Sequence, residues 1–458
     1  MQIPDKLLDK YNQPVPRYTS YPPANFFQED FGEKDFIDAM IRSNDDDPRN
    51  VSIYIHIPFC NKICHYCGCN SIKIMNAETT RDYMDALKTE LGIFRKNIDK
   101  NRKVSQVHWG GGTPNSLPAE MIEEIMNFLN HEFEFILNPE IAIECNPAGL
   151  TNKYIEVLDR SGFNRISLGI QDFSQKVLDA VNRDFPERPV EEIVNYIRAK
   201  NIRVNMDFIY GLPYQDEKKF AETIKKAVEI SPDRLVTFSY AHVPWVKGAQ
   251  KLLEKHGLPD PETKSRMFEA AAEILHNAGY RSIGLDHYAK EDDELYTSLQ
   301  NLTLHRNFQG YCTRNTTGQV YAAGISSISQ LHSAYSQNTK KVSEYISALS
   351  ENHLPVQKGY YLNKQEVVIR RVINEIMCNF YIHLGETASD MGLNIEELKK
   401  ITGLDEDKLR EFEEDGLLNY ERDKVFIKEY GKFFIRNIAS LFDPLQKTDK
   451  TRKFSKSV

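Results

Sequence analysis

The chain has 458 residues with a formal net charge of -8 at pH 7, which gives no electrostatic basis for nucleic-acid binding. We expect no signal peptide or membrane anchor, because the first twenty residues hold no apolar run and no later stretch approaches the ~20 apolar residues of a membrane span. Seven cysteines, four of them within ten positions, do not resemble a secreted disulfide framework and indicate the reducing cytoplasm.

Short β-rich runs alternate with longer helical patterns along most of the chain, which predicts βα units and a parallel sheet. The strand-like runs lie near residues 51–57, 104–109, 140–144, 165–170, 203–209 and 234–240. Apolar residues recur at intervals of three and four in the segments 82–94, 119–133 and 217–230. Six such units predict an α/β fold with a partial parallel (β/α)6 barrel, whose working residues follow the C-terminal ends of the strands.

Three cysteines follow the first predicted strand: Cys60, Cys64 and Cys67. Thiolates at this C-x3-C-x2-C spacing can hold three corners of a 4Fe-4S cluster and leave the fourth iron open to a substrate. The loop has an apolar strand before it and an aromatic residue beside its last cysteine, and it resembles the signature of the radical S-adenosylmethionine (SAM) enzymes. In that superfamily the open iron binds the amino and carboxylate groups of SAM.

Other metal sites fit this loop less well. Zinc prefers two pairs of ligands on separate turns, and the sequence offers no second Cys-x-x-Cys or His-x-x-x-His pair. A cluster ligated by four cysteines is conceivable because Cys69 follows at once. Only one glycine separates Cys67 from Cys69, however, so we expect Cys69 to lie near the cluster without binding iron.

Polar motifs follow the next predicted strands as well. Three consecutive glycines, Gly110–Gly112, lead into Thr113 and present bare backbone groups that suit close approach to a ligand, although a simple tight turn explains them equally well. Glu144 ends an apolar strand, and a buried carboxylate there requires a hydroxyl or ammonium partner. Further polar groups near strand ends are Gln171, Asp172, Arg183 and Asp207. Each of these alone fits a structural salt bridge or cap, and together they predict a site.

Almost the whole chain is similar to the oxygen-independent coproporphyrinogen III oxidases, radical SAM enzymes of anaerobic haem biosynthesis. The motifs that carry this resemblance lie at 16–22 (PRYTSYP), 60–70 (the cysteine loop), 108–114 (HWGGGTP), 209–213 (IYGLP), 240–242 (YAH) and 305–311 (HRNFQGY). In that family two propionates of coproporphyrinogen III lose CO2 and hydrogen to become the vinyl groups of protoporphyrinogen IX. A 5′-deoxyadenosyl radical, made from SAM at the cluster, starts the reaction.

The resemblance implies a ligand set for one 4Fe-4S cluster and two SAM molecules. The cluster ligands would be Cys60, Cys64 and Cys67, with Cys69 nearby but unbound. The SAM on the cluster would be held by Tyr54, Gly111, Glu144 and Ile328. The second SAM would be held by Tyr66, Gly112, Thr113, Gln171, Arg183, Asp207 and Ala241. A low-potential electron donor such as a flavodoxin or ferredoxin is expected, and we expect the protein to act as a monomer.

The substrate carries four carboxylates and requires cationic partners, among which arginine is favoured for two-point contact. Arg17, among tyrosines and a serine, and Arg306, beside His305, are the candidates, although packed surface arginines explain both equally well. Two other functions stay open, a haem-binding trafficking relative and a radical SAM enzyme acting on another tetrapyrrole. Those trafficking relatives typically have phenylalanine at the position of Cys69, which argues against the first.

We expect three regions: residues 1–50 covering the site, 51–360 as the catalytic domain, and 361–458 as a smaller, mainly helical domain. The pattern of helix, helix and hairpin-plus-helix within 395–436 is similar to a winged helix. Residues 385–416 carry eleven acids against four bases, which repels phosphate. We therefore expect this region to cover the substrate and not to bind DNA.

Overall fold

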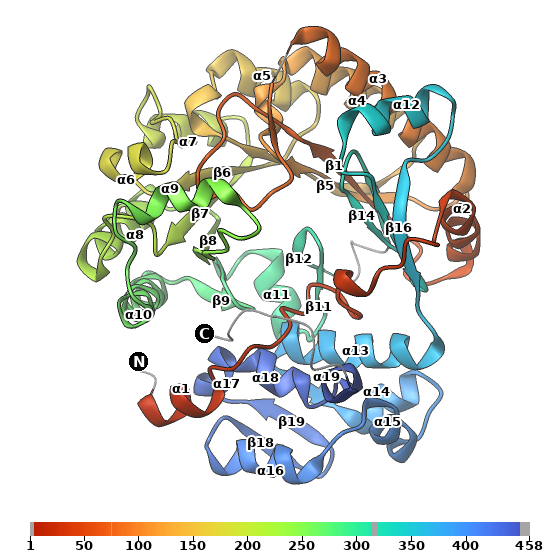
Figure 1. The fold of residues 1–458 in the computed structure, drawn as a ribbon, viewed down its shortest axis with the longest axis vertical. Coiled ribbons are helices and arrows are strands. Elements are labelled where there is room, and N and C mark those ends of the chain that lie inside the picture. The colour runs from red at the N-terminus through yellow and green to blue at the C-terminus, as the bar shows by residue number, and fades with distance from the viewer. Residues whose placement is uncertain (1–3, 75, 314–318, 449–458) are drawn as a thin grey trace.

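The computed structural model describes residues 4–74, 76–313 and 319–448. A 12-stranded mixed sheet forms its centre, in the order β16-β15-β14-β13-β1-β4-β5-β6-β7-β8-β10-β9 (Figure 1). The parallel strands are β1 (Val51–Ile57), β4 (Val104–Gly111), β5 (Phe135–Cys145), β6 (Arg165–Gln171), β7 (Arg203–Tyr210), β8 (Arg234–Ser239) and β13 (Gln319–Ala323). The six predicted strands are thus confirmed, and β13 adds a seventh parallel strand beside β1.

Antiparallel strands extend the sheet at both ends, and no pairing among the described residues joins those ends, so the barrel stays partial. The extending strands are β9 (Arg281–Ile283), β10 (His287–Ala289), β14 (Ile328–Gln330), β15 (Ala334–Asn338) and β16 (Val356–Tyr361). The smaller sheets contain β2 (Phe59–Cys60) with β3 (Ile72–Lys73), β11 (Leu304–Asn307) with β12 (Gly310–Thr313), and β17 (Tyr381–His383) with β18 (Leu418–Glu421) and β19 (Lys424–Ile427).

The α-helices connect these strands and form the C-terminal region. Those before residue 360 are α1 (Asp5–Tyr11), α2 (Glu33–Arg42), α3 (Ala77–Asn97), α4 (Ala119–Glu132), α5 (Asn152–Arg160), α6 (Gln175–Ala180), α7 (Val190–Arg198), α8 (Glu217–Ile230), α9 (Lys251–Glu254), α10 (Pro261–Asn277), α11 (Glu294–Gln300) and α12 (Val342–Ser350). The later ones are α13 (Lys364–Asn379), α14 (Leu384–Asp390), α15 (Ile395–Thr402), α16 (Glu406–Glu414), α17 (Glu429–Phe433), α18 (Ile435–Ser440) and α19 (Pro444–Thr448). Side-chain caps define several starts; Asp216, for example, accepts a hydrogen bond from the Lys219 amide before α8.

The two faces of the parallel sheet differ in chemistry. Side chains at matched register positions lie on the same face, and one such row contains Ile55, Trp109, Ile143 and Ile166, all fully buried. These residues share one apolar core with helix residues such as Leu87, and burying each large side chain contributes roughly 1.5–3 kcal/mol. The opposite, inner face carries polar side chains, listed here in strand order: Tyr54, His108, Glu144, Ser167, Asp207 and His287.

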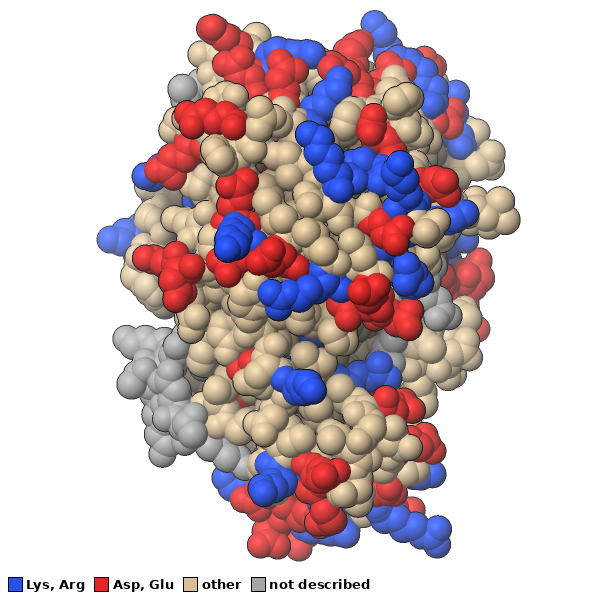
Figure 2. All heavy atoms as spheres, turned by 90° about the vertical axis from the view of Figure 1, so that its right-hand side faces the viewer, with Lys and Arg blue, Asp and Glu red and all other residues tan. Residues whose placement is uncertain are grey.

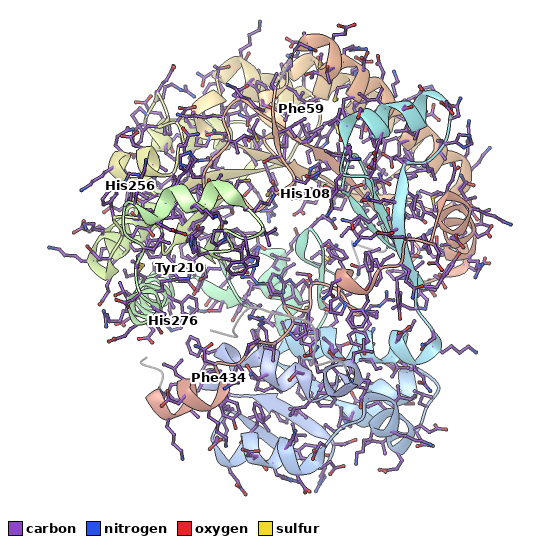
Figure 3. The ribbon with its side chains drawn as sticks, viewed as in Figure 1. Phe59, His108, Tyr210, His256, His276 and Phe434 are labelled. Atoms are coloured by element: carbon purple, nitrogen blue, oxygen red, sulfur yellow. The ribbon has the colours of Figure 1, made fainter. Side chains whose placement is uncertain are left out.

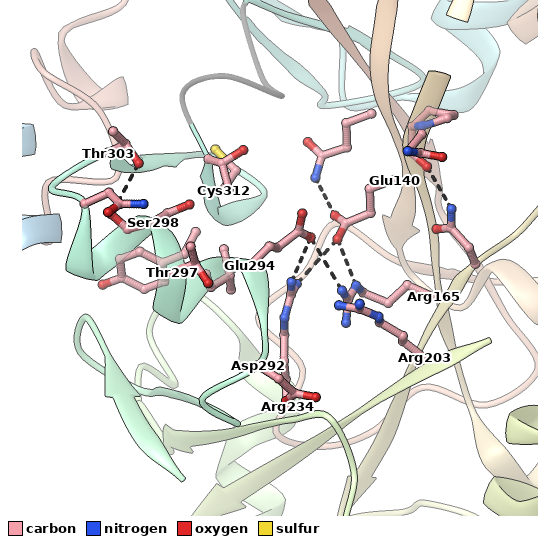
Figure 4. A pocket seen from close by; sticks show the side chains of 18 of the residues that line it. Glu140, Arg165, Arg203, Arg234, Asp292, Glu294, Thr297, Ser298, Thr303 and Cys312 are labelled. Atoms are coloured by element: carbon pink, nitrogen blue, oxygen red, sulfur yellow. Dashed lines mark hydrogen bonds and ion pairs between the residues drawn. The ribbon is translucent and has the colours of Figure 1, made fainter. Parts of the chain in front are cut away.

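An ion network fills the inner face at the N-terminal ends of these strands. Arg165 donates to Glu140 at 2.8 Å, and Arg234 donates to Asp293 at 2.9 Å and to Glu294 at 3.0 Å. Figure 4 shows Glu140, Arg165, Arg234 and Glu294 converging beside a cavity of about 600 Å³. Arg203, 3.8 Å from Asp293, brings the network to three arginines and three carboxylates. Because these charges balance and both Arg165 and Arg234 are buried, we assign this end of the barrel a structural role, opposite the polar motifs at the C-terminal ends.

A second apolar core holds the C-terminal region together. It contains α13 and the winged-helix-like elements predicted from the sequence, together with Tyr11, Tyr18 and Tyr21 of the N-terminal segment. Figure 1 shows this segment, in red, running across the blue C-terminal helices. On the face shown in Figure 2, acidic and basic side chains are interspersed. Among the described residues, no helix combines the length and the apolar character that crossing a membrane requires.

Candidate active site

The cysteine loop begins directly after β1, at the C-terminal end of the barrel. Cys60 ends β2 and is buried, Cys64 and Cys67 are partly buried, and Cys69 is exposed; all four thiols are free. The Cys60 Sγ lies 3.4 Å from the Thr113 Oγ1, which ties the loop to the segment after β4. The three candidate ligands therefore lie on one short segment at the expected end of the sheet.

The chemistry of the three thiols suits iron of a 4Fe-4S cluster. Hydrogen bonds from Cys69 and Ser71 lower the pKa of Cys67 to about 5, whereas burial raises the pKa of Cys60. Among the described residues, no three His, Cys, Asp or Glu side chains converge closely enough to ligate a single metal ion. A cubane binds each thiolate at a different iron, so it requires three separated thiols of the kind found here.

The glycine run after β4 forms a cradle beside this loop. A Cβ on Gly111, whose φ is +111°, would lie 2.6 Å from the His56 ring, and one on Gly112 would lie 2.6 Å from the Pro58 carbonyl oxygen. A Cβ on Gly110 would meet the Glu144 carboxylate at 2.8 Å. Side chains are thus excluded at all three positions, and the bare backbone forms the wall of the site.

Glu144 lies on the inner face next to this cradle. It accepts hydrogen bonds from the His108 Nε2 at 3.1 Å and from the Gly111 amide at 3.4 Å. Burial disfavours the ionised carboxylate and the protonated imidazole. The contact between Glu144 and His108 nevertheless lowers the pKa of Glu144 and raises the pKa of His108. Its partners among the described residues are thus an imidazole and a backbone amide, and the hydroxyl or ammonium partner stays a prediction. Still, 44% of the Glu144 side-chain surface is accessible, so a ligand can reach it.

Tyr54 completes this group from β1. Its ring stacks on the His108 ring with centroids 5.9 Å apart, and its hydroxyl lies 3.2 Å from the His56 Nδ1. Figure 3 shows His108 pointing towards the space that the sheet encloses. Ile328, the fourth residue of the predicted set, begins β14 and packs against the buried group of Phe27 and Tyr335. In the sheet order β14 lies two strands from β1 on one side, and β5, which carries Glu144, lies two strands from β1 on the other.

A second polar group lies beside the same loop. Arg183 donates to the Tyr66 hydroxyl at 3.3 Å, to the Cys64 Sγ at 3.6 Å and to the Gly169 carbonyl. Gln171, with φ +68°, is next to it: its Oε1 is buried and lacks a hydrogen-bond partner among the described residues. An unpaired buried acceptor in a native fold calls for a donor from a ligand or water.

Asp207 and Asp172 differ in what they contact. Asp207 accepts a hydrogen bond from Ser167 at 2.8 Å, and burial raises its pKa to about 6. Asp172 accepts hydrogen bonds from Gln215 at 2.7 Å and from Thr223, so its role is structural. Among the described side chains no ion pair joins Arg183 to Asp207. The guanidinium of Arg183 and the carboxyl group of Asp207 are therefore both available to a ligand.

The segment after β8 touches the cysteine loop through a residue that sequence reasoning missed. Gln250, which is 1% exposed, donates to the Tyr66 carbonyl at 3.1 Å and to the Ala241 carbonyl at 3.3 Å, and accepts from the Val243 amide at 2.6 Å. This brings Ala241 next to Tyr66, as the predicted set requires. The contacts of Gln250 are visible only in the folded structure, because no sequence motif marks this glutamine as part of a site.

The two candidate substrate arginines lie together. Arg306 donates to the Arg17 carbonyl at 3.4 Å and packs over the Tyr311 ring at 5.2 Å. Asp286, missed in the sequence, is hydrogen-bonded to the His287 Nδ1 at 2.7 Å. Burial opposes its ionisation, but His287, Arg306 and Arg17 together lower its pKa. The cation-rich group therefore contains one ionised acceptor.

Comparisons with known proteins agree with this geometry. Residues 54–227 match the radical SAM superfamily. The chain is 40% identical to the oxygen-independent coproporphyrinogen III oxidase of Synechocystis sp., over 99% of this chain and 97% of that one, and 38% identical to that of Escherichia coli, over 88% of each. The solved coproporphyrinogen III oxidase of Escherichia coli, described as a radical SAM enzyme, superimposes with a TM-score of 0.88 at 35% identity, covering 94% of this chain and all of that one. The chain belongs to the family of oxygen-independent coproporphyrinogen III oxidases.

Proposed function

We propose that this protein catalyses the anaerobic oxidative decarboxylation of two propionates of coproporphyrinogen III to vinyl groups, giving protoporphyrinogen IX in haem biosynthesis. The observation that carries the proposal is the cysteine loop beside a side-chain-free glycine cradle, in a chain related to these oxidases over nearly its whole length. The protein is an oxidoreductase of the radical SAM type, with a 4Fe-4S cluster and SAM as cofactors.

Cys60, Cys64 and Cys67 would ligate the cluster. When bound, the cluster and SAM supply the one-electron chemistry that removes hydrogen from an unactivated carbon, which no side-chain acid or base can do. The ionised Glu144 and the backbone of Gly111 would bind the ammonium group of SAM, with Tyr54 and Ile328 beside it. The chain's own contribution is to orient these groups and to keep water out of the barrel.

A second SAM would lie on the other side of the loop. Support comes from Arg183, whose guanidinium contacts no carboxylate in the described part of the chain, and from the Gln171 acceptor that is unpaired there. Tyr66, Gly112, Thr113, Asp207 and Ala241 complete the proposed set. An amino acid group offers both an ammonium and a carboxylate, so it could satisfy Asp207, Gln171 and Arg183 together.

The substrate would bind between the barrel and the N-terminal segment. Arg17 and Arg306 would take its propionates. Its four pyrrole nitrogens all carry hydrogen and can only donate, so an ionised acceptor is required, and Asp286 supplies one. Asp286→Asn should therefore raise the KM for coproporphyrinogen III with little change in SAM affinity, and an unchanged KM would remove Asp286 from the site.

The proposed function is tested by anaerobic incubation of the reconstituted protein with SAM, a reductant and coproporphyrinogen III. We expect protoporphyrinogen IX, methionine and 5′-deoxyadenosine, with a tricarboxylic intermediate at early times. Tight stoichiometric haem binding without turnover, in protein with a reducible cluster, would instead indicate a haem carrier. We further propose that the protein acts as a cytoplasmic monomer and receives electrons from a low-potential donor such as a flavodoxin or ferredoxin.

A further inference from the structure

One exposed apolar group stands out beside the cysteine loop. Trp245 is 79% exposed and Val246 is 67% exposed, and Leu252 on α9 is 45% exposed. The chain has two tryptophans, and the other, Trp109, is fully buried. Trp245 and Val246 are adjacent in the chain, and exposed apolar side chains of this size are typical of interaction sites. We call Trp245, Val246 and Leu252, with the neighbouring Lys251 and Lys255, the Trp245 patch.

The segment that carries the patch is joined to the cysteine loop. Lys247 donates from its Nζ to the Cys69 carbonyl at 2.7 Å, and Gln250 donates to the Tyr66 carbonyl at 3.1 Å. Figure 1 shows α9 lying in front of the sheet, next to the orange trace of this loop. The segment that carries the patch is therefore hydrogen-bonded to the loop that contains the three candidate cluster ligands.

The local charge is opposite to that of the whole molecule. Residues 60–73 and 244–256 contain five lysines and one glutamate, whereas the chain has a net charge of -8. The glutamate, Glu254, pairs with His242, and Lys62 pairs with Asp184. Lys73, which is register partner to Cys60, and both patch lysines have no ion-pair partner within the described ranges. An acidic partner would thus meet complementary charge at this surface.

We propose that the Trp245 patch is the docking surface for a small acidic electron-transfer protein that reduces the cluster. The partner's cofactor loses one electron and the cluster gains one, so no proton or group needs to cross the interface. An exposed tryptophan, followed in the chain by two lysines that have no ion-pair partner among the described residues, suits the small, transient interfaces of redox partners, which require fast encounter and fast release. The inference rests on the proposed function, since a haem carrier would not need repeated reduction.

Docking is tested by titrating an acidic flavodoxin into the anaerobic holoenzyme by calorimetry, at low and at high salt. We expect affinity to fall with salt, Trp245→Ala to weaken binding about tenfold or more, and Lys251→Glu with Lys255→Glu to weaken it and flatten its salt dependence. Leu137→Ala is the matched control, because Leu137 is 94% exposed on β5 near the opposite end of the barrel. It should bind like wild type.

A second measurement separates docking from catalysis. With dithionite as reductant, SAM cleavage by Trp245→Ala should equal that of wild type, and with flavodoxin it should fall in proportion to the lost affinity. Equal flavodoxin affinity in Trp245→Ala and wild type would overturn the proposal. A dimer that Trp245→Ala dissociates would also overturn it, because a second copy of the chain would then occupy the patch. So would a raised KM for coproporphyrinogen III in Trp245→Ala with dithionite, because the substrate would then contact the patch. Failure of the proposed function would appear differently: wild type with dithionite would give no vinyl product. The flavodoxin affinities of wild type and Trp245→Ala could still be compared in that case.

Discussion

Four cysteines lie within ten residues, and their surroundings assign them different roles. Cys60 is buried against Thr113, and Cys67 lies 3.4 Å from the Ser71 hydroxyl. Cys69 is exposed and hydrogen-bonds to Cys67 through its thiol. Cys64 is contacted by Arg183. The sequence spacing predicted the three ligands, but the position of Cys69 depends on how the loop closes.

We predict that Cys60→Ala, Cys64→Ala and Cys67→Ala each abolish cluster assembly, because three thiolates are the minimum set for the site. Iron analysis after anaerobic reconstitution should give about four irons in wild type and a large loss in each mutant. Cys69→Ala should keep its iron and lose activity. Iron loss in Cys69→Ala would make it a ligand, and normal iron in any of the other three would refute the cluster assignment.

Arg183 provides a second prediction at this scale. Among the described residues its guanidinium contacts a hydroxyl, a thiol and a carbonyl but no carboxylate, and Asp207 contacts Ser167, so the two do not brace the barrel as a pair. Arg183→Ala should remain folded, keep its cluster and bind one SAM in place of two. Equilibrium binding of labelled SAM measures this.

Arg165→Ala is the contrasting variant. It breaks a buried pair with Glu140, so it should lose roughly 3–5 kcal/mol of unfolding free energy. If Arg183→Ala were destabilised as much, or if wild type bound a single SAM, the second SAM site would have to be abandoned.

At the scale of elements, Glu90 on α3 joins three other segments. It is fully buried and accepts hydrogen bonds from Tyr345 on α12 at 2.5 Å, from Asn338 on β15 at 2.7 Å and from the Gly324 amide at 2.9 Å. Burial raises its pKa from 4.5 to about 7, although these hydrogen bonds oppose the shift. At pH values between 4.5 and about 7, the Glu90 carboxyl is therefore protonated in the folded state and ionised in the unfolded state.

The stabilising contribution of Glu90 is therefore complete below about pH 4.5 and is lost as pH rises to about 7. We predict that the unfolding free energy of wild type, measured relative to Glu90→Gln, falls by up to about 3 kcal/mol across this window. Urea denaturation at several pH values provides the measurement. Parallel pH profiles for the two proteins would show that Glu90 does not titrate in the folded state.

The sequence predicted the parallel strands well because each combines β-rich residues with a polar motif at its end. It missed β13, whose five buried residues Gln319–Ala323 have no such motif and are defined by pairing with β1 and β14. It also missed α14, and contacts such as that of Gln250 with Tyr66, in a site built by residues far apart in sequence. Pairings of this kind depend on the folded topology and leave no local pattern.

At the scale of the whole molecule, the N-terminal segment joins the two cores. Arg436 on α18 donates to the carbonyls of Val15 and Pro16, and Tyr18 donates to Asp443 at 2.9 Å. The same segment contacts the barrel side, where Tyr335 donates to the Tyr21 carbonyl at 3.2 Å. Domain boundaries at residues 50 and 360 stay predictions, but these contacts support residues 1–50 as a cover held by the C-terminal region.

We predict that Arg436→Met loosens this cover, because it removes the buried donors to two backbone carbonyls while keeping an apolar stem. The N-terminal segment should become sensitive to limited proteolysis, and the KM for coproporphyrinogen III should rise because Arg17 is no longer held beside Arg306. Iron content should not change, since the cysteine loop lies on the barrel. Arg410→Ala, an exposed arginine paired with Glu413 in the same region, should match wild type in all three measurements. A wild-type proteolysis pattern and KM in Arg436→Met would show that the segment is held mainly by its tyrosines in the apolar core, and that the C-terminal region does not position Arg17.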